Sequence, residues 1–314
     1  MYGFNRIHSR HLIAGLAAAL ACGTAPLPAS AADSTKNAAP PDFMAGGMGW
    51  NSLGGQNGRV GNDFIPMPGS PAPVTYDLAH PYVPNNVGKQ PTWRVADLNN
   101  PNLTQWAKDG LRKSNDMVAN GFAMYNRTSR CWEPGVPVLN TSPGRTYFIQ
   151  TPKEVMIVWQ RDQIVRHVYL DVPHSRNPKP SWNGESVGHY EGDTLVVDTI
   201  GLSTKSFVDN YRTPHSDRLH VIERFRMTDG GKKLEVEMTI DDPVAFVQPW
   251  KAMHRWAIDQ TQAKTMGNVT GTYNEEIRCM DGEMVNPLNQ AYAATLEPLP
   301  TDADGRETRH LSGG

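Results

Sequence analysis

From about residue 146 onward the chain alternates apolar and polar residues with a period of two, which excludes long amphipathic helices there. The clearest case is KLEVEMTID, where Leu234, Val236, Met238 and Ile240 share one face and acidic or hydroxyl residues share the other. Such alternation is typical of an antiparallel strand with one buried face. This half of the chain therefore predicts a sheet.

Similar segments follow one another with short connections and no helical pattern between them. Glu191-Gly192-Asp193 and Asp229-Gly230-Gly231 have the composition of hairpin turns. We therefore predict a mainly β fold, an antiparallel meander closed into a barrel or folded into a sandwich. The predicted strands are YFIQTP, EVMIVWQ, IVRHVYLD, SVGHY, DTLVVDTIG, LHVIERFRM, KKLEVEMTIDD, AFVQPW and HRWAID.

One helix is expected before the sheet, over residues 101–121. Leu103, Trp106, Leu111 and Val118 contribute to an apolar stripe, and Gly121 is a plausible stop. Residues 32–92 are rich in Gly, Pro, Asn and Ser, so they form either a disordered leader or an irregular strap, with docking favoured in the second half. We expect a β-barrel-like domain with its N-terminal helix over residues 93–290 and a tail over 291–314.

The N-terminus has the order of a secretory signal peptide over residues 1–31. Arg6 and Arg10 precede an apolar run, and Ala29-Ser30-Ala31 offers a cleavage site, so cleavage is expected after Ala31 or Ala32. A lipoprotein with Cys22 as the lipidated residue is the alternative. No later stretch is long and apolar enough to span a bilayer. The sequence therefore predicts a periplasmic or secreted protein.

Two cysteines remain after cleavage, Cys131 and Cys279. In an oxidising compartment an even pair predicts a disulfide, with two buried thiols as the alternative. The mature chain carries 28 basic and 32 acidic residues, a net charge of −4. This mild charge argues against nucleic acid or an anionic membrane as partner. Oligomeric state is not readable from the sequence.

The segment GESVG matches the G-x-S-x-G of the serine-hydrolase nucleophile elbow and would make Ser186 the nucleophile. An elbow needs a strand before the serine and a helix after it. Here KPSWN precedes Ser186 and a hairpin pattern follows it. We therefore interpret Gly184 and Gly188 as residues that allow a bend into a strand.

Four residues are candidates for acid–base chemistry. Pro-His-Ser occurs twice, at His174 and His215, and loops at one end of a barrel would bring both imidazoles to one mouth. Glu223 lies among the apolar residues of its strand, where a carboxylate is either paired, for example with Arg166 or Arg255, or an acid–base group with a raised pKa. His189 shares a face with Val187 and Glu191.

Trp182 and Tyr190 are candidates for an aromatic lining, and Arg224 and Asp217 for orienting a substrate. His167, His174, His189, His215, His220 and His254 show no metal-ligand spacing, so neither a metal nor a cofactor is expected, although ligands from separate strands stay possible.

The run from QTPKEVMIVWQ to DDPVAF resembles a large group of exported bacterial proteins. They share P-S-W-x-G-x-S-V-G-x-[WY]-E-G-D-T-L-V-V-D-T and a later P-H-S-x-x-L-H-V-x-E-R. The resemblance covers roughly residues 95–280 and implies a common domain but no activity. The barrel is broadly similar to lipocalin or calycin folds, by analogy alone.

Three functions remain open. The first is an exported, cofactor-independent lyase, hydratase or isomerase that acts by acid–base chemistry on a mostly apolar or aromatic small molecule. The second is a barrel that binds a hydrophobic ligand without chemistry. The third is a hydrolase that uses Ser186 or a metal. For the first we expect His174, His189, His215 and Glu223 to converge on one interior cavity.

Overall fold

The computed structural model describes residues 39–53, 63–81, 94–119, 133–142, 144–160 and 163–258. Three expectations lie outside the described residues: the signal peptide, the Cys131–Cys279 disulfide and the tail 291–314. In the described part the elements are η2 (Ala45–Gly47), β1 (Trp50–Ser52), β2 (Ile65–Pro66), α1 (Gln105–Ala119), η5 (Val138–Thr141), β3 (Arg145–Gln150), β4 (Glu154–Trp159), β5 (Ile164–Leu170), β6 (Glu185–Glu191), β7 (Thr194–Ile200), β8 (His220–Thr228), β9 (Lys233–Asp241) and β10 (Trp250–Ile258).

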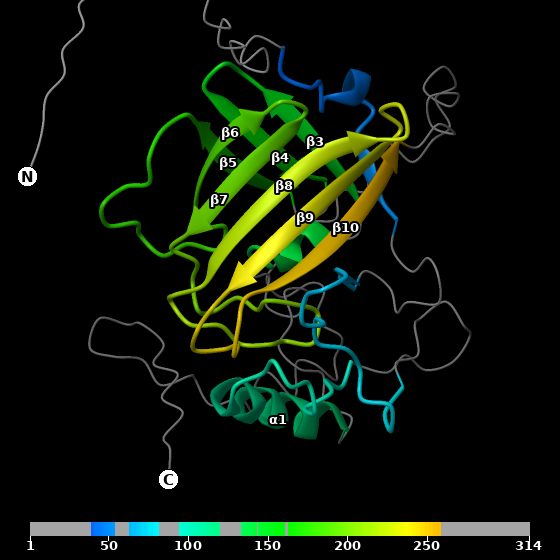
Figure 1. Ribbon diagram of the computed structural model, residues 1–314, viewed down its shortest axis with the longest axis vertical. Coiled ribbons are helices and arrows are strands. Elements are labelled where there is room, and N and C mark those ends of the chain that lie inside the picture. Colours follow the sequence, from blue (N-terminus) through cyan, green and yellow to red (C-terminus); the bar gives the residue numbers. More distant parts are fainter. Residues whose placement is uncertain are drawn as a thin grey trace, which may run out of the picture. The chain divides into compact units, whose positions relative to one another are not determined.

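The strands form one sheet that closes on itself (Figure 1). Strands β3 to β10 are hydrogen-bonded in sequence order, and β1 pairs with both β3 and β10. The described residues thus make a closed nine-stranded barrel, with β2 added on β10. Of the two predicted arrangements, the barrel is confirmed and the sandwich is not formed.

The barrel departs from a pure antiparallel meander between β5 and β6, which are parallel over three residue pairs, Val168 with Ser186 to Leu170 with Gly188. Residues 171–184 cross back along the barrel before β6 begins, which makes this joint parallel. The predicted strand AFVQPW, residues 245–250, is also not formed: residues 245–249 lie in a turn, and β10 begins only at Trp250. The Asp242 carboxylate accepts hydrogen bonds from the backbone N–H groups of Val244 and Ala245 and holds a turn there.

Strand alternation fills the barrel interior as the sequence predicts. Leu234, Val236, Met238 and Ile240 of β9 are fully buried. The hairpin turns are at the expected places, with Gly192 at φ +60° and Gly230 at +62°. The main core joins the barrel to α1 and to the loops; the largest buried side chains are Trp50, Trp159, Trp250, Trp256, Arg166, Tyr211, Phe43, Phe225, Leu111, Leu139, Ile157 and Leu195.

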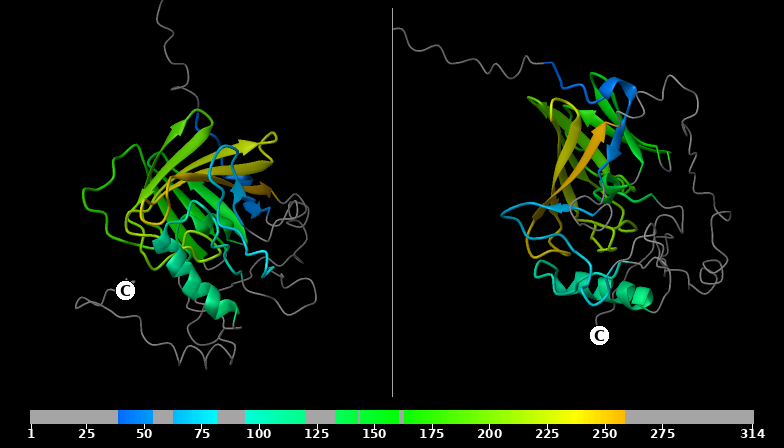
Figure 2. Two further views of the ribbon diagram at one scale, coloured as in Figure 1. Left: turned by 60° about the horizontal axis from the view of Figure 1, so that its bottom comes forward. Right: turned by 90° about the vertical axis from the view of Figure 1, so that its right-hand side faces the viewer.

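The predicted helix is present and begins at Gln105, four residues after Pro101. Thr104 is its cap, because its Oγ1 accepts from the Ala107 N–H and donates to the Val244 carbonyl. Leu103 also bridges to Phe246, so α1 starts against the turn between β9 and β10 (Figure 2). Gly121 lies outside the described residues. No helix among the described residues is long and apolar enough to cross a membrane.

The Gly/Pro-rich region contributes to the barrel itself. Trp50 in β1 and Phe43 before it are fully buried, and the Trp50 indole donates to the Phe43 carbonyl at 2.8 Å. We expected docking mainly in the second half of residues 32–92, whereas β1 lies in the first half and closes the barrel. A strand of three residues shows too little alternation to be recognised from sequence.

Candidate functional site

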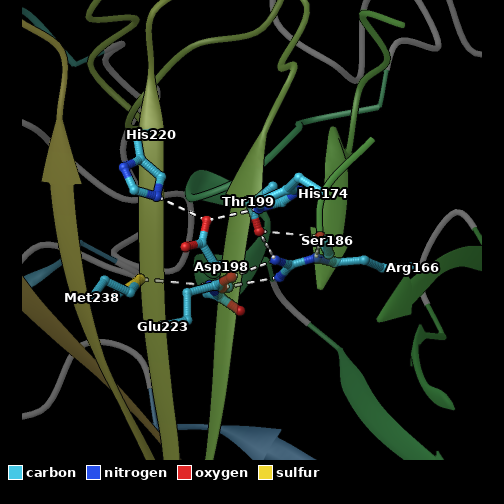
Figure 3. A network of polar contacts seen from close by, with 9 residues as sticks. Arg166, His174, Ser186, Asp198, Thr199, His220, Glu223 and Met238 are labelled. Atoms are coloured by element: carbon cyan, nitrogen blue, oxygen red, sulfur yellow. Dashed lines mark hydrogen bonds and ion pairs between the residues drawn. The ribbon is translucent and has the colours of Figure 1, made fainter. Parts of the chain in front are cut away.

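The four predicted acid–base residues do not meet. His174 lies on the crossover loop, and His189 is half-exposed on β6 beside Glu191, 3.1 Å away. His215 is buried in the loop between β7 and β8, and Glu223 is buried inside the barrel. Each has its own polar partners, and the structure shows two separate networks on the two faces of β7 (Figure 3).

The interior network is built around an ion pair between Arg166 of β5 and Glu223 of β8, whose side chains are 1% and 0% exposed. The Arg166 Nη1 donates to Glu223 Oε1 at 3.0 Å, and its Nη2 contacts Oε2. The same guanidinium donates to Ser186 Oγ at 3.1 Å and to Thr199 Oγ1 at 2.7 Å. Asn140 of η5 adds a hydrogen bond to Glu223 Oε1 at 2.5 Å.

Of the two roles expected for Glu223, the structure shows the ion pair, and Arg166 is the partner. Arg255, the other named candidate, pairs instead with Glu235 on the outer face at 2.8 Å. A buried carboxylate that is paired and hydrogen-bonded from several sides meets the requirement for keeping its charge in an apolar interior. The Glu223 carboxylate is thus engaged by Arg166 and Asn140.

Ser186 is part of the same interior network. It lies within β6, near the start of the strand, and is 2% exposed. Its hydroxyl contacts Arg166 and Thr199, and among the described residues no histidine bonds to it. The strand–turn–helix context of a nucleophile elbow is missing, as the sequence predicted.

The outer network is carried by Asp198, the residue before Thr199 on β7. Because side chains alternate along a strand, Thr199 faces the interior and Asp198 the outside. Asp198 pairs with Val187 on β6 and Ile222 on β8, so Glu185 and His220 are its diagonal neighbours. His174 from the crossover loop completes the cluster.

Two imidazoles share one carboxylate oxygen in this cluster. Asp198 Oδ1 lies 2.8 Å from His220 Nε2 and 3.0 Å from His174 Nε2. His174 Nδ1 also lies 3.1 Å from Glu185 Oε1, and that oxygen accepts from the Ser175 N–H at 2.7 Å. We call the chain Glu185–His174–Asp198–His220 the outer cluster. Its side chains are 20–39% exposed.

The charges of the outer cluster shift its pKa values in opposite directions. The hydrogen bond to Asp198 raises the pKa of His220, against the smaller effect of desolvation, and Asp198 and Asp241 add to the increase as nearby charges. The His220 hydrogen bond lowers the pKa of Asp198, with His174 contributing further. The hydrogen bonds from Ser175 lower the pKa of Glu185. The cluster therefore favours anionic carboxylates beside a protonated His220.

His220 has one anchored and one available ring nitrogen. Nε2 is held by Asp198, whereas Nδ1 makes no hydrogen bond to any described residue, and the side chain is 37% exposed. A carboxylate that orients an imidazole from one nitrogen leaves the other to exchange a proton. Among the described residues this is the arrangement best suited to acid–base chemistry.

The other predicted substrate-binding residues are dispersed. The half-buried Tyr190 hydroxyl accepts from Gln150 at 2.8 Å, and burial raises its pKa. Arg224 pairs with Glu191 on the outer face at 2.7 Å, and Asp217 is exposed in a turn. Trp182 is partly buried before β6, beside Gly135. Tyr190 and Arg224 thus pair with Gln150 and Glu191, which lie outside the outer cluster.

Sequence reasoning did not select Asp198, His220 or Glu185. The only signal was that Asp198 and His220 fall on polar positions of neighbouring strands, and their diagonal contact depends on a register that turn composition does not reveal. Within the described residues no group of three or more histidine, cysteine or acidic side chains is placed to hold a metal ion.

Comparisons with protein-family models, with curated proteins and with solved structures found no match for this chain.

Proposed function

We propose that this protein moves protons on a small, mostly apolar organic molecule, as a lyase, hydratase or isomerase, and that His220 is its acid–base residue. One observation carries the proposal: Asp198 holds His220 Nε2 at 2.8 Å, and Nδ1 of the same partly exposed ring is unpartnered among the described residues. This is the orientation that general acid–base catalysis requires of an imidazole.

Asp198 fixes the tautomer of His220. A carboxylate only accepts, so Nε2 carries the hydrogen in this contact and Nδ1 is left with a lone pair or with the exchangeable proton. Protonated His220 can donate from Nδ1 to a developing oxyanion or leaving oxygen. Neutral His220 can accept a proton at the same atom, so one residue supports both directions of transfer.

His174 and Glu185 support this role of His220, because His174 bridges the Asp198 and Glu185 carboxylates. Both His174 nitrogens face carboxylate oxygens, at 3.1 Å and 3.0 Å, so both contacts are satisfied together only when both nitrogens carry hydrogens. The His174 contact lowers the pKa of Asp198 and so helps to keep that carboxylate ionised. His174 is thus a positioning residue in this scheme.

The surroundings favour a neutral substrate. Asp198 and Asp241 place two carboxylates near His220, and Glu185 adds a third on the far side of His174, so the cluster disfavours an anion. Val187 and Ile222 directly flank Asp198 on the outer face and offer apolar contact. The filled barrel interior is the reason for preferring the outer cluster over the interior site expected from sequence.

Hydrogen–deuterium exchange tests the proposal while the substrate is still unidentified. The purified protein is incubated in D2O with a panel of small neutral ketones, enones and hydroxy-ketones, and loss of carbon-bound protons is followed by NMR. We expect exchange on at least one compound above the buffer rate. His220→Gln should reduce it by about 10²–10⁴-fold, the usual contribution of an acid–base group.

His189→Gln is the matched control, because His189 is also exposed on this face and bonds a carboxylate, Glu191. It should keep the wild-type exchange rate. Exchange that persists in His220→Gln would remove His220 from the site. Saturable binding of a panel compound with no exchange in any variant would instead support a ligand-binding protein without chemistry.

We also propose that the protein is exported, because its N-terminus has the order of a signal peptide. Mass analysis of the exported chain should give a mature N-terminus at Ala32 or Asp33, and thiol titration after denaturation without reductant should find no free cysteine. A retained Met1, or two reactive thiols, would contradict export or the disulfide respectively.

A further inference from the structure

A pair formed by an imidazole and a serine hydroxyl lies outside the outer cluster, in the loop between β7 and β8. His215 Nε2 is 2.8 Å from Ser206 Oγ, and His215 Nδ1 is 2.8 Å from the Ser216 carbonyl oxygen. Ser206 and His215 are each 2% exposed. A hydroxyl, an imidazole and an orienting acceptor in this order are the recurring parts of an activated serine.

The Ser216 carbonyl determines which His215 nitrogen carries the hydrogen in the neutral ring. A carbonyl only accepts, so His215 Nδ1 carries a hydrogen and donates to the Ser216 oxygen. In the neutral ring Nε2 is therefore the lone-pair nitrogen and can accept the Ser206 proton. The contact has the direction that a general base needs.

The orienting carbonyl is itself held in place. The buried Asp242 carboxylate accepts from the Ser216 N–H at 2.6 Å and from the Ser216 hydroxyl at 2.8 Å. Asp242 also caps the turn before β10, so the position of Ser216 is tied to the barrel end. Asp242 thus acts on His215 through the Ser216 main chain, as a positioning residue.

The pair can also accommodate the protonated ring. Imidazolium donates from Nδ1 to Ser216 and from Nε2 to Ser206 Oγ, while the Ser206 hydroxyl lies 2.9 Å from the Ser203 carbonyl. Both protonation states of His215 are therefore hydrogen-bonded, so proton uptake leaves no buried N–H without an acceptor. A histidine that only packs in the core does not require hydrogen-bond partners for both protonation states.

Gly135 packs closely against Ser206. A Cβ added at Gly135 would lie 2.8 Å from Ser206 Oγ and 2.8 Å from the Trp182 carbonyl oxygen, so glycine permits this close approach. Residue 133 of the same segment is held by a hydrogen bond from Asn183 Nδ2 to Glu133 Oε2 at 2.8 Å. Because Ser206 is 2% exposed, a reagent reaches its hydroxyl only when the surrounding chain moves.

We propose that Ser206 is a nucleophile activated by His215, reactive toward small acyl esters, and independent of the His220 chemistry. Ser206 Oγ would form a bond to the acyl carbon while its proton passes to His215 Nε2. The ester C–O bond then breaks, and the alcohol leaves with that proton. Water, deprotonated by His215, would release the acid and restore the serine.

A fluorophosphonate probe tests this on the intact, folded chain. Attack by Ser206 Oγ forms an O–P bond and expels fluoride, and the proton goes to His215 and then to solvent. Peptide mass mapping of the wild-type protein should find one adduct, at Ser206. Ser206→Ala should abolish it, and His215→Gln should slow its formation by about 10²-fold or more.

Ser186→Ala is the matched control, because Ser186 carries the G-x-S-x-G pattern but bonds Arg166 and Thr199 instead of a histidine. It should label like the wild type. No adduct at Ser206 in the folded wild-type protein after prolonged incubation overturns the proposal, whatever the folding of the variants. Equal labelling rates in folded His215→Gln and wild type also overturn it.

Discussion

At the scale of single residues, the interior ion pair makes a prediction about stability. Glu223→Gln keeps the shape of the side chain but leaves the Arg166 charge buried without its counter-ion, because both side chains are at most 1% exposed. We expect the free energy of unfolding to fall by about 3–5 kcal/mol, measured by urea denaturation. Folded Glu223→Gln should still support exchange at His220.

The matched control for this change is Glu235→Gln. Glu235 pairs with Arg255 on the outer face at 2.8 Å, where the arginine side chain is 43% exposed. Removing such a surface pair should cost no more than about 1 kcal/mol. Equal losses in the two variants would show that the interior pair is not a special determinant of stability.

The outer cluster makes a separate prediction about pH. The pKa of His220 is raised above 6.5, mainly by the Asp198 hydrogen bond, so Asp198→Asn should lower it toward or below that value. The contact stabilises the fold at pH values below 6.5 and loses this effect as pH rises through the raised pKa. NMR titration of the imidazole signals measures this. An unchanged His220 titration in Asp198→Asn would contradict the assignment.

At the scale of elements, Thr104 connects the start of α1 with the turn before β10. Its hydroxyl accepts from the Ala107 N–H at 3.3 Å and donates to the Val244 carbonyl at 2.7 Å. Thr104→Ala removes both contacts and should cost about 0.5–2 kcal/mol, whereas Thr104→Ser keeps the hydroxyl and should cost less. Thermal unfolding compares the two, and equal losses would exclude the capping role.

The type of each element and the hairpin pairs followed from local residues, whereas the parallel pairing and the contacts across the sheet did not. Alternation in KLEVEMTID and the Gly-rich turns predicted β9 and the hairpins, because these signals lie within one strand or loop. The parallel joint of β5 and β6 depends on where residues 171–184 cross, which no local pattern encodes. The outer cluster was missed for the same reason, since Asp198 and His220 meet only through strand register.

At the scale of the whole molecule, two buried groups give opposite pH dependences. Burial raises the pKa of Asp209 to about 6, so the folded state gains stability as pH falls from about 6 toward 3.8. Burial lowers the pKa of His254 to about 3, so the folded state loses stability as pH falls below 6.5. Each slope is about 1.4 kcal/mol per pH unit, and they largely cancel.

Asp209→Asn should therefore reveal the uncompensated effect of His254. Between about pH 6 and pH 4.5 the variant should lose stability with acidification much more steeply than the wild type, by up to about 1.4 kcal/mol per pH unit. Urea denaturation at three pH values in this range measures the slopes. Parallel pH profiles for the two proteins would show that Asp209 does not titrate in this range.

The position of β1 has a consequence for how the chain is made. Ser52 and His254 are 202 residues apart along the chain, yet they hydrogen-bond across β1 and β10 where the barrel closes. During translation, β1 is synthesised long before β10. Until β10 emerges, the growing sheet has unpaired edges, which can recruit strands from other chains. The risk of aggregation during biosynthesis therefore lasts until nearly the whole domain has been translated.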